Sequence, residues 1–164
     1  MRSTDSPSDR NSPWEGKSLI SITMTGTPVG QARPRFRRTP IKLKKRKGIS
    51  YSYPEPVSAA YKLALRWCAL IAMAGRKPFT GPVIVNIIAY FPPSMHLSRQ
   101  GRKDALAGKH DHLIRIDKDN IEKLVLDSLK GIVYVDDKQA VDGNTRKTYS
   151  EKPRIEIEVT PRED

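Results

Sequence analysis

Cys68 is the only cysteine in the sequence, so no disulfide can form within one chain. Cys68 lies between Trp67 and Ala69 in an apolar helical pattern, which favours a buried side chain over a reactive thiol. A fold without disulfides suits a reducing compartment, and we expect the protein in the cytoplasm. Residues 1–17 also lack the apolar segment of a signal peptide, and we expect them to form a disordered tail before a domain at 18–161.

Long hydrophobic runs are also missing. None approaches the ~20 apolar residues that cross a bilayer, which argues against a membrane protein. Acidic residues are scarce: 18 Asp and Glu face 30 Lys and Arg, and the net charge is +12. This imbalance favours a polyanionic partner, with nucleic acid as the first candidate. The 164 residues suit one domain with one hydrophobic core.

Hydrophobic periodicity and turn residues predict an α+β domain. The expected order is β-α-β-α-β-β, with a small mixed sheet of about four strands and two main helices packed on it. Strands are expected at 19–25, 82–91, 139–149 and 154–160, and helices at 59–74 and 119–130. The strand at 82–91 is apolar on both faces, which is typical of a central strand covered on both sides. We expect 94–111 to form a polar loop.

One apolar stripe runs along the first predicted helix. Its members recur at i, i+3, i+4 and i+7 spacing, and they are Ala60, Leu63, Ala64, Trp67, Leu70, Ile71 and Ala74. Such a stripe is typical of a face packed on the core. The helix and the central strand together offer more apolar surface than one small sheet can cover. The alternative is therefore that part of this surface contacts a second chain.

A strongly basic segment follows the first strand. Residues 31–48 hold nine Lys or Arg, no acid and two Pro, so we expect an exposed loop that binds the phosphate backbone of nucleic acid. The candidate DNA-binding residues are Arg33, Arg35, Arg37, Arg38, Lys42, Lys44, Lys45, Arg46 and Lys47. Phe36 lies among them; a packed or simply exposed ring is favoured over stacking on an unpaired base.

Acidic residues gather in one short part of this basic chain. Asp117 and Asp119 lie at the junction of a loop and the second helix, where residues two apart can point the same way. Lys123 follows one helical turn later and Asp127 one turn further, so Asp127 is expected to hold Lys123 in place. Asp136 and Asp137 come after a short apolar run that can return the chain beside the helix. Clustered carboxylates of this kind are suited to binding Mg²⁺.

Ordinary structural roles explain each acid separately. Asp119 and Glu122 fit a capping box, Lys123 and Asp127 fit a surface ion pair, and Asp136 with Asp137 fits a polar turn. These roles explain poorly why so many acids gather in a basic protein. Elsewhere, a pair of histidines at 110 and 112 lacks cysteine partners, and solvated side chains are favoured there over a metal site.

The acidic pattern resembles the RusA family of Holliday-junction resolvases, which is common in bacteriophages and prophages. The matching pattern is Asp117-x-Asp119-Asn120-x-x-Lys123-x-x-x-Asp127-x-Leu129, then Asp136-Asp137-x-Gln139. The segment Gly30-Gln31-Ala32-Arg33-Pro34-Arg35 is similar to the family's basic motif. Two positions depart from the family: Ile116 stands where Pro is common and Lys118 where an apolar residue is usual. Neither departure removes a metal ligand.

The resemblance implies a homodimer that nicks opposed strands of a four-way DNA junction with Mg²⁺, with Mn²⁺ as a substitute. Asp117, Asp119 and Asp137 then match the catalytic metal ligands, Lys123 matches the essential lysine, and Asp136 is a further candidate ligand. Asn120 matches a supporting position of the motif. Two alternatives stay open: a nuclease for branched DNA in general, and a basic DNA-binding protein without catalysis.

Overall fold

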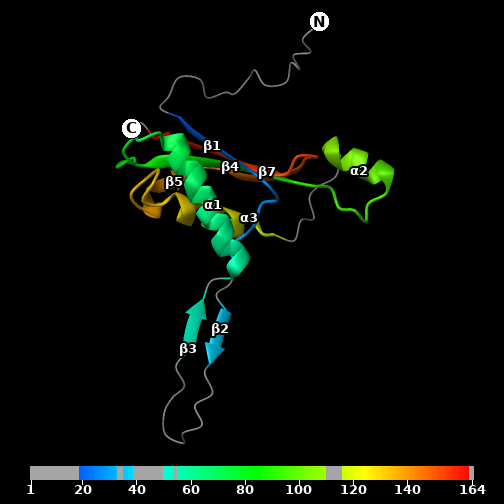
Figure 1. The fold of residues 1–164 in the computed structure, drawn as a ribbon. Coiled ribbons are helices and arrows are strands. Elements are labelled where there is room, and N and C mark those ends of the chain that lie inside the picture. Colours follow the sequence, from blue (N-terminus) through cyan, green and yellow to red (C-terminus); the bar gives the residue numbers. More distant parts are fainter. Residues whose placement is uncertain (1–18, 33–34, 39–49, 54, 110–115, 163–164) are drawn as a thin grey trace, which may run out of the picture.

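The computed structural model describes residues 19–32, 35–38, 50–53, 55–109 and 116–162. The predicted tail at 1–17 lies outside these residues. Five strands form one mixed sheet (Figure 1). In it, β7 (Arg154–Pro161) pairs antiparallel with β1 (Ile20–Thr25) and with β4 (Val83–Phe91). Two short strands, β5 (Ala140–Asp142) and β6 (Thr145–Tyr149), pair parallel with β4. The predicted α+β class with a mixed sheet is confirmed.

The hydrophobic core lies on one face of this sheet. Along β4, buried residues alternate with half-buried ones, and β1 and β7 show the same period of two. The buried set packs against α1 (Pro56–Met73) and α3 (Lys118–Leu129). The prediction that β4 is covered on both sides is therefore only half right, because the two helices cover one face and the other face of β4 stays partly exposed.

Helix α3 follows the predicted pattern closely. Ile121, Leu124, Val125 and Leu129 are all buried, as their helical spacing predicts. The N-cap lies two or three residues earlier than expected, because Asp117 rather than Asp119 or Asn120 occupies that position. Its end is followed by Gly131, whose φ of 75° is in the left-handed region and reverses the chain.

Helix α1 buries a different face from the predicted one. Its buried residues are Ser58, Leu65, Ala69 and Met73, whereas the predicted stripe stays outside, with Trp67 at 61% and Ile71 at 76% exposure. Two of the four buried residues, Ser58 and Ala69, are small, and two cations one turn apart, Lys62 and Arg66, bind α3. Because α1 is apolar around most of its surface, periodicity alone could not choose between the faces.

Two parts of the fold differ from the predicted loops. Within the basic segment, β2 (Arg35–Arg38) pairs antiparallel with β3 (Ser50–Tyr53), and this ribbon projects from the domain beside the start of α1 (Figure 1). The expected loop at 94–111 contains α2 (Arg99–Leu106).

The expected strand at 139–149 is also interrupted. The short 3-10 helix η1 (Asp137–Gln139), β5 and β6 replace it, with Gly143 between the two strands. The φ of Gly143 is 147°, and a Cβ there would collide with the carbonyl oxygen of Val85. In the described part of the chain, no helix is long and apolar enough to cross a membrane.

Candidate active site

The start of α3 presents the first pair of acidic residues. Asp117 is the N-cap residue and Asp119 lies in the first turn, where the helix dipole favours negative charge. Both carboxylates are exposed, and the described residues supply neither of them with a hydrogen bond or an ion pair. Their oxygen atoms are therefore available to a ligand from solution.

The segment that leads into the basic ribbon is held against this helix start. The backbone N–H of Gln31 donates to the carbonyl oxygen of Asn120 at 2.8 Å, and that of Ala32 donates to the hydroxyl of Ser58 at 3.2 Å. The Ser58 hydroxyl in turn donates to the carbonyl oxygen of Gly30 at 3.3 Å. Gly30 comes so close that a Cβ there would lie 2.7 Å from Cγ2 of Ile116. These contacts hold the start of the basic segment against the start of α3, where Asp117 and Asp119 lie.

A second pair of carboxylates lies at η1. The Asp136 side chain accepts a hydrogen bond from the N–H of Lys138 at 3.1 Å, and Gln139 accepts one from the N–H of Asp136 at 2.8 Å, which forms a capping box. The amide of Gln139 also donates to the carbonyl oxygens of Phe79 and Gly81. These bonds tie the acidic turn to the segment before β4.

One ammonium group brings the two carboxylates of this turn together. Nζ of Lys130 lies 3.0 Å from an oxygen of Asp136 and 3.0 Å from an oxygen of Asp137. The N–H of Lys138 and the Lys130 ammonium hold the pKa of the Asp136 carboxyl well below its usual range, and the two carboxylates raise the pKa of Lys130. Asp136 and Asp137 thus both contact the ammonium group of Lys130.

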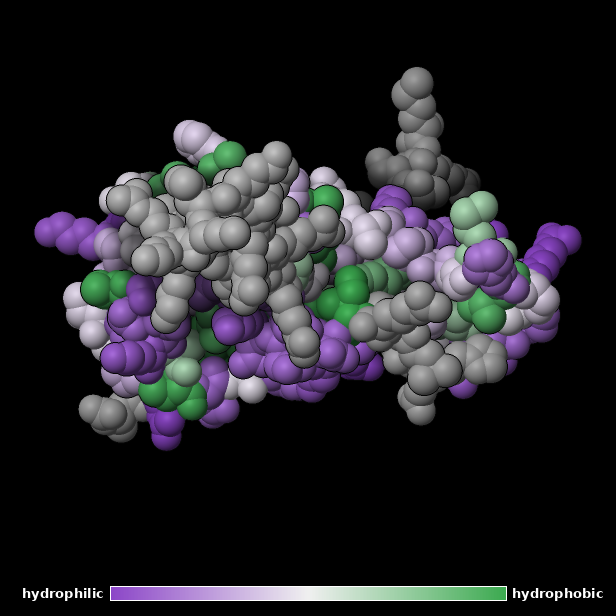
Figure 2. Space-filling view, turned by 90° about the horizontal axis from the view of Figure 1, so that it is seen from below, coloured by the Kyte–Doolittle hydropathy of each residue, from purple (hydrophilic) through white to green (hydrophobic). Residues whose placement is uncertain are grey.

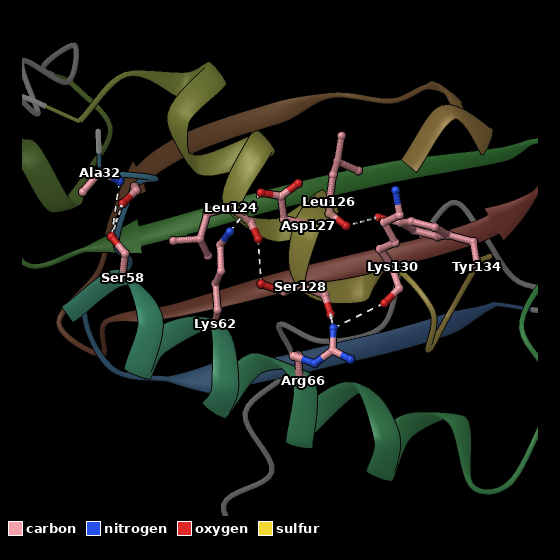
Figure 3. Close-up of polar contacts among 11 residues, drawn as sticks. Ala32, Ser58, Lys62, Arg66, Leu124, Leu126, Asp127, Ser128, Lys130 and Tyr134 are labelled. Atoms are coloured by element: carbon pink, nitrogen blue, oxygen red, sulfur yellow. Dashed lines mark hydrogen bonds and ion pairs between the residues drawn. The ribbon is translucent and has the colours of Figure 1, made fainter. Parts of the chain in front are cut away.

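Lys130 is not among the residues that the sequence pattern predicts for the site. Its place depends on the turn at Gly131, whose N–H donates to the carbonyl oxygen of Tyr134 at 2.7 Å. The Tyr134 hydroxyl donates to the carbonyl oxygen of Leu126 at 2.9 Å, so this turn is fixed to α3 (Figure 3). In the sequence, the signal for this contact is a Lys directly before a Gly and several residues before two Asp. The closed turn at Gly131 is what brings the Lys130 ammonium to both carboxylates.

Asp127 has a different partner from the expected one. It binds Nζ of Lys62 in α1 at 2.9 Å, and not Lys123 (Figure 3). Nearby, the Arg66 guanidinium donates to the carbonyl oxygens of Ser128 at 3.1 Å and Lys130 at 3.3 Å, which satisfies the end of α3. Asp127 therefore helps to join the two helices. Lys123 is exposed and has no ion pair among the described residues.

The acidic residues lie at two places, the start of α3 and the turn at η1. Among the residues described, no group of three or more His, Cys, Asp or Glu side chains lies close enough to hold one metal ion. The pair at Asp136 and Asp137 nevertheless fits a cation, because an ammonium already sits between two carboxylate oxygens. Hard oxygen donors of this kind are the ligands that Mg²⁺ prefers.

The candidate DNA-binding residues are only partly described. Arg35, Arg37 and Arg38 lie in β2, as does Phe36, and their backbone forms the ribbon. Outside the described residues lie the others, which are Arg33, Lys42, Lys44, Lys45, Arg46 and Lys47, together with the histidines at 110 and 112.

Comparison with known proteins agrees with these features. Residues 25–160 match the family model described as endodeoxyribonuclease RusA. The chain is also similar to the uncharacterized protein YqaN of Bacillus subtilis (strain 168), with 33% identity over 144 residues. That alignment covers 85% of this chain and 94% of the relative.

Proposed function

The chain belongs to the RusA family of endodeoxyribonucleases, and from this premise we propose that it is a Mg²⁺-dependent enzyme that resolves four-way DNA junctions by paired nicks. The observation that carries the proposal is the arrangement at η1, where two carboxylates converge on the Lys130 ammonium at 3.0 Å in a chain of net charge +12. Acidic side chains at the surface of a basic protein weaken its electrostatic attraction to DNA, so DNA binding alone does not explain them. A metal site explains them.

The proposed metal ligands are Asp117, Asp119 and Asp137, with Asp136 as a further ligand. Because the first two lie at the start of α3 and the other two near its end, sharing one ion would require the two places to move closer together. Bound Mg²⁺, or Mn²⁺ in its place, would lower the pKa of a water molecule and stabilise the charge that develops on the phosphate. Without the metal, the carboxylates repel the DNA phosphates. Binding of metal and binding of DNA should therefore favour each other.

Lys123 is proposed to contact the phosphate that is cut. It lies on α3 one turn after Asp119, is exposed, and has no carboxylate partner among the residues described. Because Asp127 is paired with Lys62 instead, the Lys123 ammonium is free to approach an anionic substrate. An ammonium group at that point would offset the negative charge that develops on the phosphate in the transition state.

The basic segment is proposed to hold the DNA backbone. The β2–β3 ribbon projects from the domain beside the place where residues 30–32 contact the start of α3 (Figure 1). Arg35, Arg37 and Arg38 in β2 would then contact phosphates next to the acidic pair. Contacts of this kind give affinity and position without reading sequence.

A homodimer is part of the proposal, and the outer face of α1 supports it. Leu63, Trp67, Leu70 and Ile71 are between 48% and 76% exposed although they form one apolar stripe. Exposed apolar stripes of this size are typical of contact surfaces. Trp67 lies near the middle of the helix, so a two-fold axis there would pack α1 against its copy in an isologous contact. Two chains supply the two nicking sites that one junction requires.

The test is cleavage of a labelled four-way junction by the purified protein, with and without Mg²⁺, beside a linear duplex of the same sequence. We expect Mg²⁺-dependent cleavage of the junction at symmetric positions and little cleavage of the duplex. A supercoiled cruciform plasmid should become linear within one binding event. Equal cleavage of flaps and forks would support the broader branched-DNA nuclease. Binding without cleavage in any divalent metal would leave a DNA-binding protein without catalysis.

A further inference from the structure

A second basic surface lies at the end of the domain where β4 leaves the sheet. An open cleft of about 500 Å³ is found there between α2, the segment after β4 and the β6–β7 turn. Three cations line it, Arg99, Arg102 and Lys103, together with two prolines, two leucines and one acid, Glu151. In Figure 2 hydrophilic and hydrophobic side chains lie side by side at this end of the molecule.

Helix α2 is oriented so that its cations face the cleft. Arg99, Arg102 and Lys103 share one helical face, at i, i+3 and i+4 spacing. Ala105, on a neighbouring side of the helix, is only 2% exposed. The helix also has a regular start, because the hydroxyl of Ser98 accepts a hydrogen bond from the N–H of Gly101 at 3.1 Å. The three cations therefore lie together on one face of a capped helix.

These three cations lack ion-pair partners among the described residues. Lys62, Lys130 and Arg154 each bind a carboxylate within 3.0 Å, whereas no described carboxylate forms an ion pair with Arg99, Arg102 or Lys103. Glu151 is the single acid that lines the cleft, so the cleft carries a net positive charge. Unpaired guanidinium groups above an apolar floor are suited to an anionic ligand.

The cleft lies within reach of a DNA strand that is bound at Asp117, at the start of α3. The Lys147 ammonium in β6 donates to the carbonyl oxygen of Ile116 at 2.9 Å, directly before Asp117. From Lys147, β6 runs three residues to the turn at Ser150, which is ~10 Å at ~3.3 Å per residue. One strand of duplex DNA advances ~3.4 Å per nucleotide, so this span corresponds to about three nucleotides.

We propose that the α2 cleft binds backbone phosphates of the junction arm, about three nucleotides from the cut. This inference rests on the proposed function, because it takes the acidic residues as the cleavage site. The basic ribbon and the cleft would then hold the DNA at two separate places, one on each side of the cut. Two such contacts would fix the direction in which an arm leaves the active site.

The test compares two triple variants that lose the same charge. One carries Arg99→Gln, Arg102→Gln and Lys103→Gln. The control carries Gln at three exposed cations outside the cleft, Arg76, Lys77 and Arg162. Junction binding is measured without divalent metal over a range of salt concentrations. We expect the slope of log affinity against log salt to fall by up to ~2.7 in the cleft variant, at ~0.9 for each lost phosphate contact. The control should change it much less.

A junction with one uncharged methylphosphonate locates the contact. Neutralising a phosphate about three nucleotides from the cut should weaken binding by the native protein and leave binding by the cleft variant unchanged, as a double-mutant cycle requires. Equal slopes for the cleft and control variants would overturn the proposal, as would a methylphosphonate effect that survives in the cleft variant. Circular dichroism checks that each variant is folded. If the native protein cuts no junction but the cleft variant still loses salt dependence, the resolvase function fails while the cleft remains a DNA-binding site.

Discussion

Replacing Gly30 by Ala tests whether the contact between the basic segment and α3 positions the active site. A Cβ on Gly30 would lie 2.7 Å from Cγ2 of Ile116 and 3.2 Å from Cβ of Asn120. Both distances are shorter than a relaxed carbon–carbon contact of ~3.5–4.0 Å. The new methyl group therefore has to push these two residues away, and they flank Asp117 and Asp119 in the sequence.

The expected cost follows from overpacking. Inserting a methyl group into a closely packed contact lowers the free energy of unfolding by about 1–3 kcal/mol. For a chain of this size that corresponds to a fall in melting temperature of about 2–4 °C per kcal/mol. Cleavage should suffer more than stability, because a misplacement of about 1 Å at catalytic groups can cost about 100-fold in rate.

Gly81→Ala is the matched control. No atom lies within 4 Å of a Cβ at Gly81, and its φ is not in the left-handed region. That substitution should change the free energy of unfolding by at most about 0.5–1 kcal/mol, and in the stabilising direction if at all. Urea denaturation measures both variants, and single-turnover cleavage of a four-way junction measures their activity. If Gly30→Ala is as stable and as active as Gly81→Ala, the contact does not position the acidic residues.

Four further predictions concern single side chains. Asp119→Asn should reduce cleavage at least about 100-fold while junction binding is kept or tightened, since it removes a metal ligand and one charge that repels phosphate; near-normal cleavage excludes Asp119 as a ligand. Lys123→Ala should slow single-turnover cleavage by about 10²–10³-fold with little change in affinity, and a normal rate would make it an ordinary surface lysine. Lys130→Met should tighten Mg²⁺ binding, measured by calorimetry without DNA, because it removes the ammonium that lies between Asp136 and Asp137. Weaker binding would show that Lys130 helps to hold the metal site open. Trp67→Lys should convert the dimer to a monomer in light scattering, with Met95→Lys, at a residue 88% exposed outside α1, as the control; a dimer that survives would place the interface elsewhere.

Much of the domain was predictable because its signals are local. The buried stripe of α3, the central strand β4 and the turn at Gly131 follow from side-chain spacing and from backbone preferences of single residues. The grouping of acids in a basic chain was equally visible, since it needs only counting and spacing. These features led to the family and to the candidate residues before any contact was known.

The tertiary structure decided where those residues point and what they bind. The exposed and buried faces of α1 are both apolar, and the choice between them depends on Lys62 and Arg66 meeting α3. The partner of Asp127 and the ammonium between Asp136 and Asp137 likewise come from residues that other elements or a closed turn bring near. Spacing along a chain specifies neighbours within one helix or strand. Ion pairs between elements depend on how those elements pack, and packing is determined by the whole set of side chains together.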